Sequence, residues 1–361
     1  MSSNFPKALY GRERGAALIV ALVVVLLVVM LATRVSSDYL VLFRSVENQS
    51  GLQQARAYLR GAELVATEAL LRDMQSSSEI DSMLEPWAQR ANLPLPEGVL
   101  DACVTDLQAR LNLNDLLSVE GSYSPAQKRF IRLLQVVDPE LDSAAATALA
   151  NAVFDWIDPD SNQRYPGGAE ALDYMRANAP HPYRPANQAF ASVSELRLIA
   201  GFDSELVAAL TPHLSVWGNG NMNLNTMDAE SGATIADQSA TDSDAPVLLR
   251  TLNTADSLLP LSSDGARLLA AARSNNGGVF ENFEVFTTAP FTAQQWELDG
   301  LALTSSFFEL RAVMQSSSRT YAMTSVLQRD IAPTGEPRVN IVSRRFNGAE
   351  TGGTGCAAAL P

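Results

Sequence analysis

The strongest hydrophobic pattern in the chain is an uncharged, largely apolar run over residues 16–33. About 18 apolar residues suffice for a helix to cross the hydrocarbon core of a bilayer. Beyond this run, small and apolar residues recur at spacings of three and four, which predicts an amphipathic helix. This stripe consists of Leu52, Ala55, Leu59, Ala62, Ala66 and Ala69. We therefore predict one long helix over residues 16–73, with the transmembrane segment at 16–33. The alternative is an anchor followed by a separate surface helix, with Gly51 as the break.

Alternating patterns predict a small antiparallel sheet formed by segments that lie far apart in the sequence. Residues 99–113 alternate as a half-buried strand does, after a turn signalled by the prolines and glycine of 94–98. Three further alternating segments, 308–314, 320–328 and 338–346, follow one another near the C-terminus. We expect these three to form an antiparallel meander that pairs with the first strand.

The stretch between the first strand and the meander is rich in helical patterns. The predicted organisation is a sheet domain from residues 74–111 and 290–361, interrupted by two helical lobes at 112–215 and 216–289. The fold class is therefore α+β, with a long N-terminal helix packed on the sheet and a large helical insertion.

Two short segments within the insertion are weakly similar. Leu-Asn-Leu-Asn-Asp at 111–115 and Met-Asn-Leu-Asn-Thr at 222–226 each lead from an extended segment into a helix-rich region. They indicate a duplicated lobe, although the match covers only a few residues. The polar, turn-rich stretch 231–245 is expected to be a loop.

The residues that precede the apolar run resemble a processing signal. Arg12, Glu13, Arg14 and Gly15 stand directly before Ala16. A secretory signal has its small-residue cleavage site after the apolar run, whereas here the small residues come before it. This order resembles the class III signal of type IV prepilins and pseudopilins, which implies that prepilin peptidase cleaves the leader 1–15 between glycine and alanine. The alternative is an ordinary signal anchor with a chance glycine.

The fifth residue after the predicted cleavage site departs from the pattern of most pilins. That position is Val20, where major pilins and pseudopilins carry glutamate, which is thought to neutralise the N-terminal amine of the neighbouring subunit. A buried carboxylate without a partner is costly, so a subunit with no neighbour above it has no use for one. In this family the missing glutamate is typical of type II secretion system protein K.

Several short sequence segments in the middle of the chain, taken in order, also resemble the helical domain of the protein K family. They are Asp155-Trp156-Ile157-Asp158-Pro159-Asp160, Gly168-Ala169-Glu170, Asp173-Tyr174, Pro182 to Asn187 and Ser194-Glu195-Leu196-Arg197. The resemblance implies a minor pseudopilin at the pseudopilus tip, which initiates assembly with minor pseudopilins of the I and J families. It also implies contact with the secretin or with secreted cargo.

Charge and composition agree with an exported globular body. The 361 residues carry a formal net charge of −14, although the leader itself is basic. Basic residues before the apolar run keep that end cytoplasmic and direct the remainder outward. An acidic ectodomain binds nucleic acid poorly, because phosphate affinity requires clustered Lys and Arg. We therefore expect a single-pass inner-membrane protein with a periplasmic domain and no nucleic-acid partner.

The chain has two cysteines, Cys103 and Cys356, both beyond the predicted membrane segment. In an oxidising periplasm we expect them to form a disulfide that ties an early segment to the C-terminal tail. On the chain-entropy model this contributes up to ~5 kcal/mol. The alternative is two unrelated buried thiols. Together with His181 and His213 they lack the paired close spacing of a zinc site.

Four carboxylates crowd one short turn-rich segment: Asp158, Asp160, Glu170 and Asp173. Such a concentration repels itself unless a hard cation neutralises it, and Ca²⁺ takes six to eight oxygen ligands in a flexible cage. The segment is not an EF-hand, because Gln163 stands where that loop needs glycine. We predict a structural Ca²⁺ loop, in agreement with what the family resemblance implies. The alternative is a solvated acidic turn.

The sequence offers little for catalysis or for nucleic-acid binding. It contains no Gly-x-Ser-x-Gly elbow and no Gly-x-x-x-x-Gly-Lys phosphate loop. Residues 194–217 resemble a helix-hairpin-helix or SAM-like unit, but Asp203 and Glu205 follow its hairpin, which favours a packing module over a DNA-binding one. We therefore expect a non-enzymatic secretion component. The alternative is a minor pilin of a type IV pilus or competence system that binds a surface or DNA.

Overall fold

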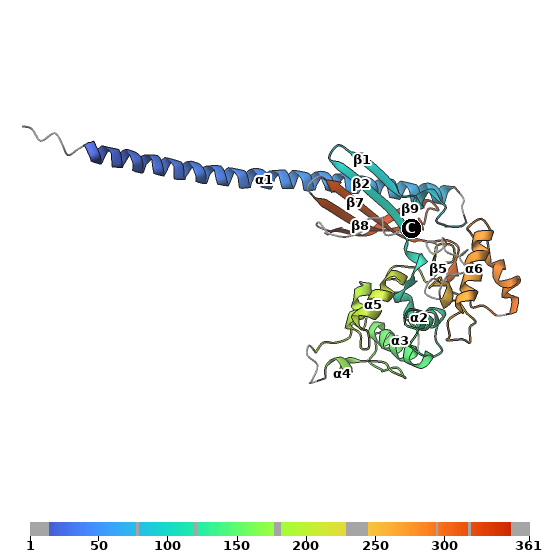
Figure 1. Cartoon of the computed structure of the whole chain (residues 1–361). Coiled ribbons are helices and arrows are strands. Elements are labelled where there is room, and N and C mark those ends of the chain that lie inside the picture. The colour runs from blue at the N-terminus through green and yellow to red at the C-terminus, as the bar shows by residue number, and fades with distance from the viewer. Residues whose placement is uncertain are drawn as a thin grey trace, which may run out of the picture. The chain divides into compact units, whose positions relative to one another are not determined.

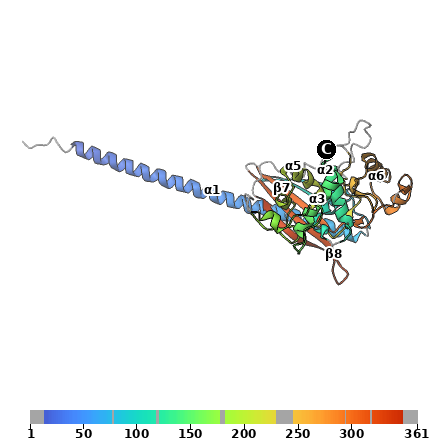
Figure 2. The ribbon, with the colours of Figure 1, turned by 90° about the horizontal axis from the view of Figure 1, so that it is seen from below.

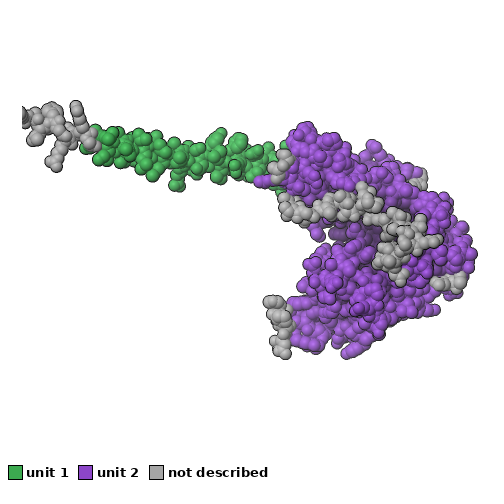
Figure 3. Space-filling view, viewed as in Figure 1, with its two compact units in different colours: residues 1–58 green, residues 59–361 purple. Residues whose placement is uncertain are grey.

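The computed structural model describes residues 14–76, 79–117, 121–176, 182–228, 245–293, 295–316 and 319–347. It divides into two compact units, residues 1–58 and 59–361, shown in different colours in Figure 3. The leader before residue 14 and the tail after residue 347 lie outside the described residues.

The first unit consists of the greater part of one long helix, α1 (Arg14–Gln75). The described residues confirm the prediction of one continuous helix, and Gly51 does not interrupt it. A window within Ala16–Gln75 has a mean hydropathy of 3.2, and none of it is buried. Its leucines and valines are exposed, which costs free energy in water and not in lipid. By length and composition this helix can span a membrane.

The second unit contains a five-stranded antiparallel sheet (Figure 1). The order along the sheet is β1, β2, β7, β8, β9, with every neighbouring pair antiparallel. The bounds are β1 (Ala91–Leu95), β2 (Gly98–Asp106), β7 (Phe307–Ser316), β8 (Thr320–Ile331) and β9 (Pro337–Asn347). The predicted C-terminal meander and its pairing with the early strand are confirmed.

Two details of the early strands differ from the prediction. β2 ends at Asp106, because a 3₁₀ turn at Leu107–Ala109 begins there with the Asp106 side chain as its cap. The turn predicted at 94–98 is confirmed at residues 96–97, between β1 and β2, although Pro94 itself lies within β1. β1 is an edge strand, where a residue without an N–H donor is tolerated.

The last part of α1, which belongs to the second unit, packs on one face of the sheet. Leu59 and Leu70 are fully buried there. Glu63 accepts a hydrogen bond of 2.5 Å from Ser325 of β8 and forms an ion pair of 2.5 Å with Arg344 of β9. The helix is thereby fixed to two neighbouring strands by apolar burial and by an ion pair between the buried Glu63 and the exposed Arg344.

The chain between β2 and β7 forms two helical lobes, seen in Figures 1 and 2. The first contains α2 (Pro125–Val137), α3 (Ser143–Ile157), α4 (Ala171–Tyr174) and α5 (Ser204–Leu210), and the second contains α6 (Ser263–Asn275). Each lobe is closed by a short parallel pair: β3 (Leu111–Asn112) with β4 (Leu214–Ser215), and β5 (Met222–Asn223) with β6 (Leu301–Ala302).

A shared asparagine clamp supports the predicted duplication of the lobes. In the first lobe Asn114 accepts a hydrogen bond from the Phe190 amide at 2.7 Å and donates to its carbonyl at 3.1 Å. In the second lobe Asn225 makes the same two bonds with Phe280, at 2.7 and 3.0 Å. The similar five-residue segments therefore mark equivalent positions in two related frames.

The lobe boundaries differ from those predicted. Because β6 pairs with β5, the second lobe extends to Ala302, and residues 290–302 belong to it instead of to the sheet domain. The first lobe starts with β3, which pairs with β4 at its end. Most of the predicted loop at 231–245 lies outside the described residues.

Candidate metal centre

Three of the four predicted carboxylates come together in the first lobe. Asp158 caps the C-terminal end of α3, and Glu170 caps the N-terminal end of α4. With Asp160, each offers a carboxylate oxygen that lies within 4.8 Å of the others. Asp158 and Glu170 are buried, whereas Asp160 is exposed at the mouth of the group. The loop between the two helices thus folds back so that its acidic ends meet.

Several buried oxygens around this group accept no hydrogen bond. They include Oδ1 of Asp158, Oε1 of Glu170 and Oδ1 of Asn187. Asn187 is held by two hydrogen bonds. Its backbone amide donates to the Trp156 carbonyl at 2.9 Å, and its side-chain amide donates to the Asp160 carbonyl at 2.7 Å. Buried polar atoms normally have hydrogen-bond partners, and carboxylate and amide oxygens of this kind are the ligands that a hard cation takes. Asn187 was not among the predicted site residues.

Asp173, the fourth predicted ligand, is engaged elsewhere. Its Oδ2 accepts a hydrogen bond of 3.1 Å from the Glu170 amide and completes a capping box on α4. Its Oδ1 pairs with Arg176 at 2.5 Å. Both oxygens therefore serve the local helix, and Asp173 lies outside the three-carboxylate group.

The electrostatics of the loop show the cost of gathering these charges. Burial raises the pKa of Asp158, and the neighbouring charge of Asp160 raises it further. The pKa of Glu170 is raised mainly by burial and then by the Asp158 and Asp160 charges. Arg164 offsets part of this, with its Nε 3.6 Å from Asp158 Oδ2 and 3.7 Å from Asp155 Oδ1. Asp158 and Glu170 would both ionise more readily beside a divalent cation.

The loop is fixed to the lobe through Asp155 and Gly168. Asp155 is fully buried on α3 and accepts the Arg164 amide with both oxygens, at 3.1 and 3.3 Å. A Cβ added to Gly168 would lie 2.2 Å from Asp155 Oδ2, so only glycine lets the loop approach so closely. Burial raises the pKa of Asp155 to about 7.

Aromatic rings hold the far side of the loop. Trp156 packs edge-on against Tyr174 and Tyr183, with ring centroids 5.6 and 6.3 Å apart. The Tyr183 hydroxyl donates to the Leu198 carbonyl, and the Tyr174 hydroxyl accepts from the Ala200 amide at 3.3 Å. These contacts tie the acidic loop to the hairpin that follows it.

That hairpin packs inward. The turn at Gly201, with φ +89°, connects a 3₁₀ helix at Val193–Leu198 to α5, which Asp203 caps. Leu196, Val207 and Leu210 are buried in the core of the lobe. The arrangement supports the prediction of a packing module, although its first helix is 3₁₀ and not α.

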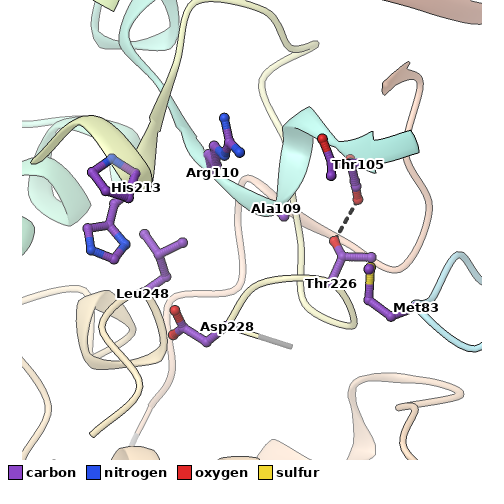
Figure 4. A pocket seen from close by; sticks show the side chains of 10 residues that line it. Met83, Thr105, Ala109, Arg110, His213, Thr226, Asp228 and Leu248 are labelled. Atoms are coloured by element: carbon purple, nitrogen blue, oxygen red, sulfur yellow. Dashed lines mark hydrogen bonds between the residues drawn. The ribbon is translucent and has the colours of Figure 1, made fainter. Parts of the chain in front are cut away.

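A cavity of about 190 Å³, lined by polar and apolar side chains, lies where the sheet and both lobes meet (Figure 4). His213 and Arg110 reach it from the first lobe side, and Asp228 and Leu248 line it from the second. The dashed line in Figure 4 marks the hydrogen bond that the Thr226 hydroxyl donates to Asp106 Oδ2, at 2.6 Å. Asp106 is buried and further bonded by Ser305, so these polar groups serve the junction of the lobes with the sheet.

The predicted disulfide stays a prediction. Cys103 lies on β2 opposite Arg311 and is not a free thiol. Cys356 lies outside the described residues, as does His181. Of the other residues considered for zinc, His213 lines the junction cavity, where burial lowers its pKa.

Comparison with known proteins places the chain in one family. The sequence model described as "Type II secretion system (T2SS), protein K" matches residues 109–219. A type II secretion system protein K from Pectobacterium carotovorum is 27% identical over 94% of this chain and 98% of its own length. Another from Klebsiella pneumoniae is 33% identical over 62% of this chain and 70% of its own length.

A solved structure has the same fold. It belongs to the GspK–GspI–GspJ complex of the enterotoxigenic Escherichia coli type 2 secretion system. The likeness covers 84% of this chain and 99% of the other, with a TM-score of 0.63 and 21% identity. The fold agrees with this relationship in its long helix, antiparallel sheet and helical insertion, and the sequence relatives match along nearly the whole length. The chain therefore belongs to the type II secretion system protein K family of minor pseudopilins.

Proposed function

We propose that the protein occupies the tip of the type II secretion pseudopilus and initiates its assembly with minor pseudopilins of the I and J families, supporting export of folded periplasmic proteins. The observation that carries the tip position is Val20, which lacks the carboxylate that a subunit below another would use. The GspK–GspI–GspJ complex, whose K-family chain shares this fold, supports the choice of partners. Family membership favours this function over a type IV or competence pilin. The role is structural and not catalytic.

The proposed orientation follows from the charges that flank α1. Lys7, Arg12 and Arg14 precede the apolar run, and such residues are retained on the cytoplasmic side. The second unit would then lie in the periplasm, where its lobes are free to meet the secretin or cargo. Prepilin peptidase would remove residues 1–15 before assembly.

Leader removal is tested by replacing Gly15 with a bulky residue. Gly15→Leu should block processing, because the peptidase has to fit closely around the backbone there. Val20→Leu, which alters the same segment beyond the cleavage site, should be processed normally. N-terminal sequencing of membrane-extracted protein distinguishes the two, and a wild-type chain with an intact leader or a cut after Ala32 would overturn the pseudopilin assignment.

The tip position is tested in isolated pseudopili. Tagged full-length chain, produced with the I and J proteins of its own secretion system, should co-purify with both. Antibody labelling should mark the filament ends alone. Labelling along the whole filament would refute the tip position, and failure to retain either partner would refute the complex.

We further propose that the acidic loop binds Ca²⁺ as a structural ion. Asp158, Asp160 and Glu170 would supply carboxylate oxygens, with the amide oxygen of Asn187 as a fourth ligand. Bound Ca²⁺ would neutralise the crowded charge and fix the loop against α3, which helps to present the first lobe in one shape. Oxygen ligands of mixed charge in a flexible loop suit Ca²⁺ better than Zn²⁺.

A further inference from the structure

A second group of carboxylates lies far from the acidic loop, beside the C-terminal end of α1. Asp73 is in the last turn of that helix, and Asp81 and Glu85 follow in the segment that leads to β1. Each offers an oxygen within 4.8 Å of the other two. Neither the sequence patterns nor the family comparisons single out this group.

One side of the group is already engaged by protein donors. Oδ2 of Asp81 accepts hydrogen bonds from Arg329 and from the Ser305 amide, the latter at 2.5 Å. Oδ2 of Asp73 pairs with the other terminal nitrogen of Arg329 at 2.6 Å. Oε2 of Glu85 accepts the indole N–H of Trp87 at 2.5 Å. These contacts, together with that from the Ser82 amide to Glu85 Oε2 at 3.3 Å, hold the three side chains in place.

One oxygen of the group has no hydrogen-bond partner. Asp81 is 1% exposed, and its Oδ1 has no hydrogen-bond partner. A buried carboxylate oxygen without a donor is costly, because it has lost water and gained nothing in exchange. Burial raises the pKa of Asp81 to about 7, with Arg329 opposing the shift.

Among the described residues, Arg329 is the cation that forms ion pairs with the group. Arg329 contributes a single positive charge against three carboxylates, which leaves two negative charges. Its guanidinium has no freedom to move closer, because Nε donates to the Ser305 carbonyl at 2.6 Å and its plane lies over Phe308, 5.0 Å from the ring centroid. The residual charge equals that of one divalent cation.

We propose that Asp73, Asp81 and Glu85 form a second binding site for a hard divalent cation, Ca²⁺, independent of the acidic loop. Carboxylate oxygens are the ligands such ions prefer, and water can complete the shell because Asp73 and Glu85 are only partly buried. The ion links the end of α1 to the segment before β1 and, through Arg329, to β8. It stabilises the foot of the sheet, whereas the loop ion stabilises the first lobe.

The test uses the full chain in detergent with the loop site removed by Asp158→Asn and Glu170→Gln. Tb³⁺ is the probe, since it replaces Ca²⁺ at oxygen sites and emits when a nearby tryptophan is excited. Trp87 donates directly to Glu85, which places it beside the proposed ion. We expect one equivalent of Tb³⁺ to give sensitised emission that excess Ca²⁺ displaces.

Glu85→Gln should weaken this Tb³⁺ binding at least tenfold, and Asp73→Asn should do the same. Both replacements keep the side-chain shape and an acceptor oxygen, so the fold is retained. The matched control is Glu79→Gln, an exposed glutamate outside the group. Trp87→Phe should abolish the emission while calorimetry still detects Ca²⁺ binding.

Two results would overturn the proposal: no binding of Tb³⁺ or Ca²⁺ in the loop-deficient chain, or unchanged binding in Glu85→Gln. The first would mean that a proton on Asp81 balances the charge. Calorimetry on otherwise unaltered chain gives an independent answer, because Glu85→Gln alone should lower the Ca²⁺ stoichiometry from two to one. Glu85→Gln should remove one Ca²⁺ whether or not the acidic loop binds its own ion, so the two sites are judged separately.

Discussion

The two helical lobes share the asparagine clamp and the short parallel strand pair, but they differ in how their buried polar groups are satisfied. In the second lobe, residues 276–279 are all that separate α6 from the clamp phenylalanine Phe280, whereas in the first lobe residues 158–189 separate α3 from Phe190. The second lobe satisfies its carbonyls internally through Arg273, which donates to those of Leu224 and Met227 at 3.0 and 2.7 Å. The first lobe carries the long acidic loop with its orphaned oxygens.

The difference indicates how a long loop is accommodated without disturbing the frame. The asparagine clamp and the short parallel strands close each lobe whatever lies between them. A long segment inserted between helix and clamp can then be specialised for an ion. We expect the first lobe to depend on an external cation and the second to depend on its own arginine.

The largest effect should come from removing the internal cation of the second lobe. Arg273→Met should lower the free energy of unfolding by about 3–5 kcal/mol, because buried carbonyls and Asp228 lose their partner. Denaturant unfolding with and without Ca²⁺ measures it, and Ca²⁺ should not restore the loss. The control is Arg267→Met on the same helix, whose pairing partner Asp264 is exposed. Equal losses in both variants would contradict the internal role of Arg273.

The next effect concerns the acidic loop. Ca²⁺ at a hundredfold excess over its dissociation constant should add about 2.7 kcal/mol to the stability of the state that binds it. Asp160→Ala and Glu170→Ala should each abolish the gain attributed to this loop, while the sheet stays folded. Thermal melts with Ca²⁺ and with a chelator provide the test. If the variants keep the full gain of the unaltered chain, the loop is a solvated acidic turn.

A smaller effect should appear in the pH dependence without Ca²⁺. The pKa of Asp155 is raised to about 7, so the folded state holds its proton more tightly than the unfolded state. Its contribution to stability is present below about pH 4 and is lost as pH rises through about 7. In chelator, the free energy of unfolding should therefore be about 2 kcal/mol lower at pH 7 than at pH 5 on account of this group. Asp155→Asn should flatten the dependence of the free energy of unfolding on pH. An unchanged pH dependence in this variant would show that Asp155 does not cause it.

The smallest effect should distinguish the helix cap from the ligands. Asp173→Ala removes the capping contact to Glu170 and an exposed pair with Arg176, which should cost about 0.5 kcal/mol. The Ca²⁺ gain should remain nearly intact, unlike that of Asp160→Ala. Melts of the two variants in parallel decide the matter, and loss of the gain in Asp173→Ala would return this residue to the ligand set.

The family, the membrane helix and the sheet strands could be predicted because their signals are local. An uncharged run over 16–33 has one stable environment, and alternation identifies strands whichever segments they pair with. The carboxylates of the acidic loop were also visible, since they stand within a short stretch. The duplication of the lobes was also indicated in the sequence, by two similar five-residue segments.

Only the tertiary structure decided which oxygens meet. It turned Asp173 to the cap of α4 and brought Asn187 to the loop from beyond it. It also joined Asp73 and Asp81 to Arg329, which lies in β8 far along the chain. Long-range packing sets these distances, and residues that alternate or cluster in sequence carry no information about a partner contributed by a remote strand. The sequence by itself determined the types of element and the family, and the fold determined the sites.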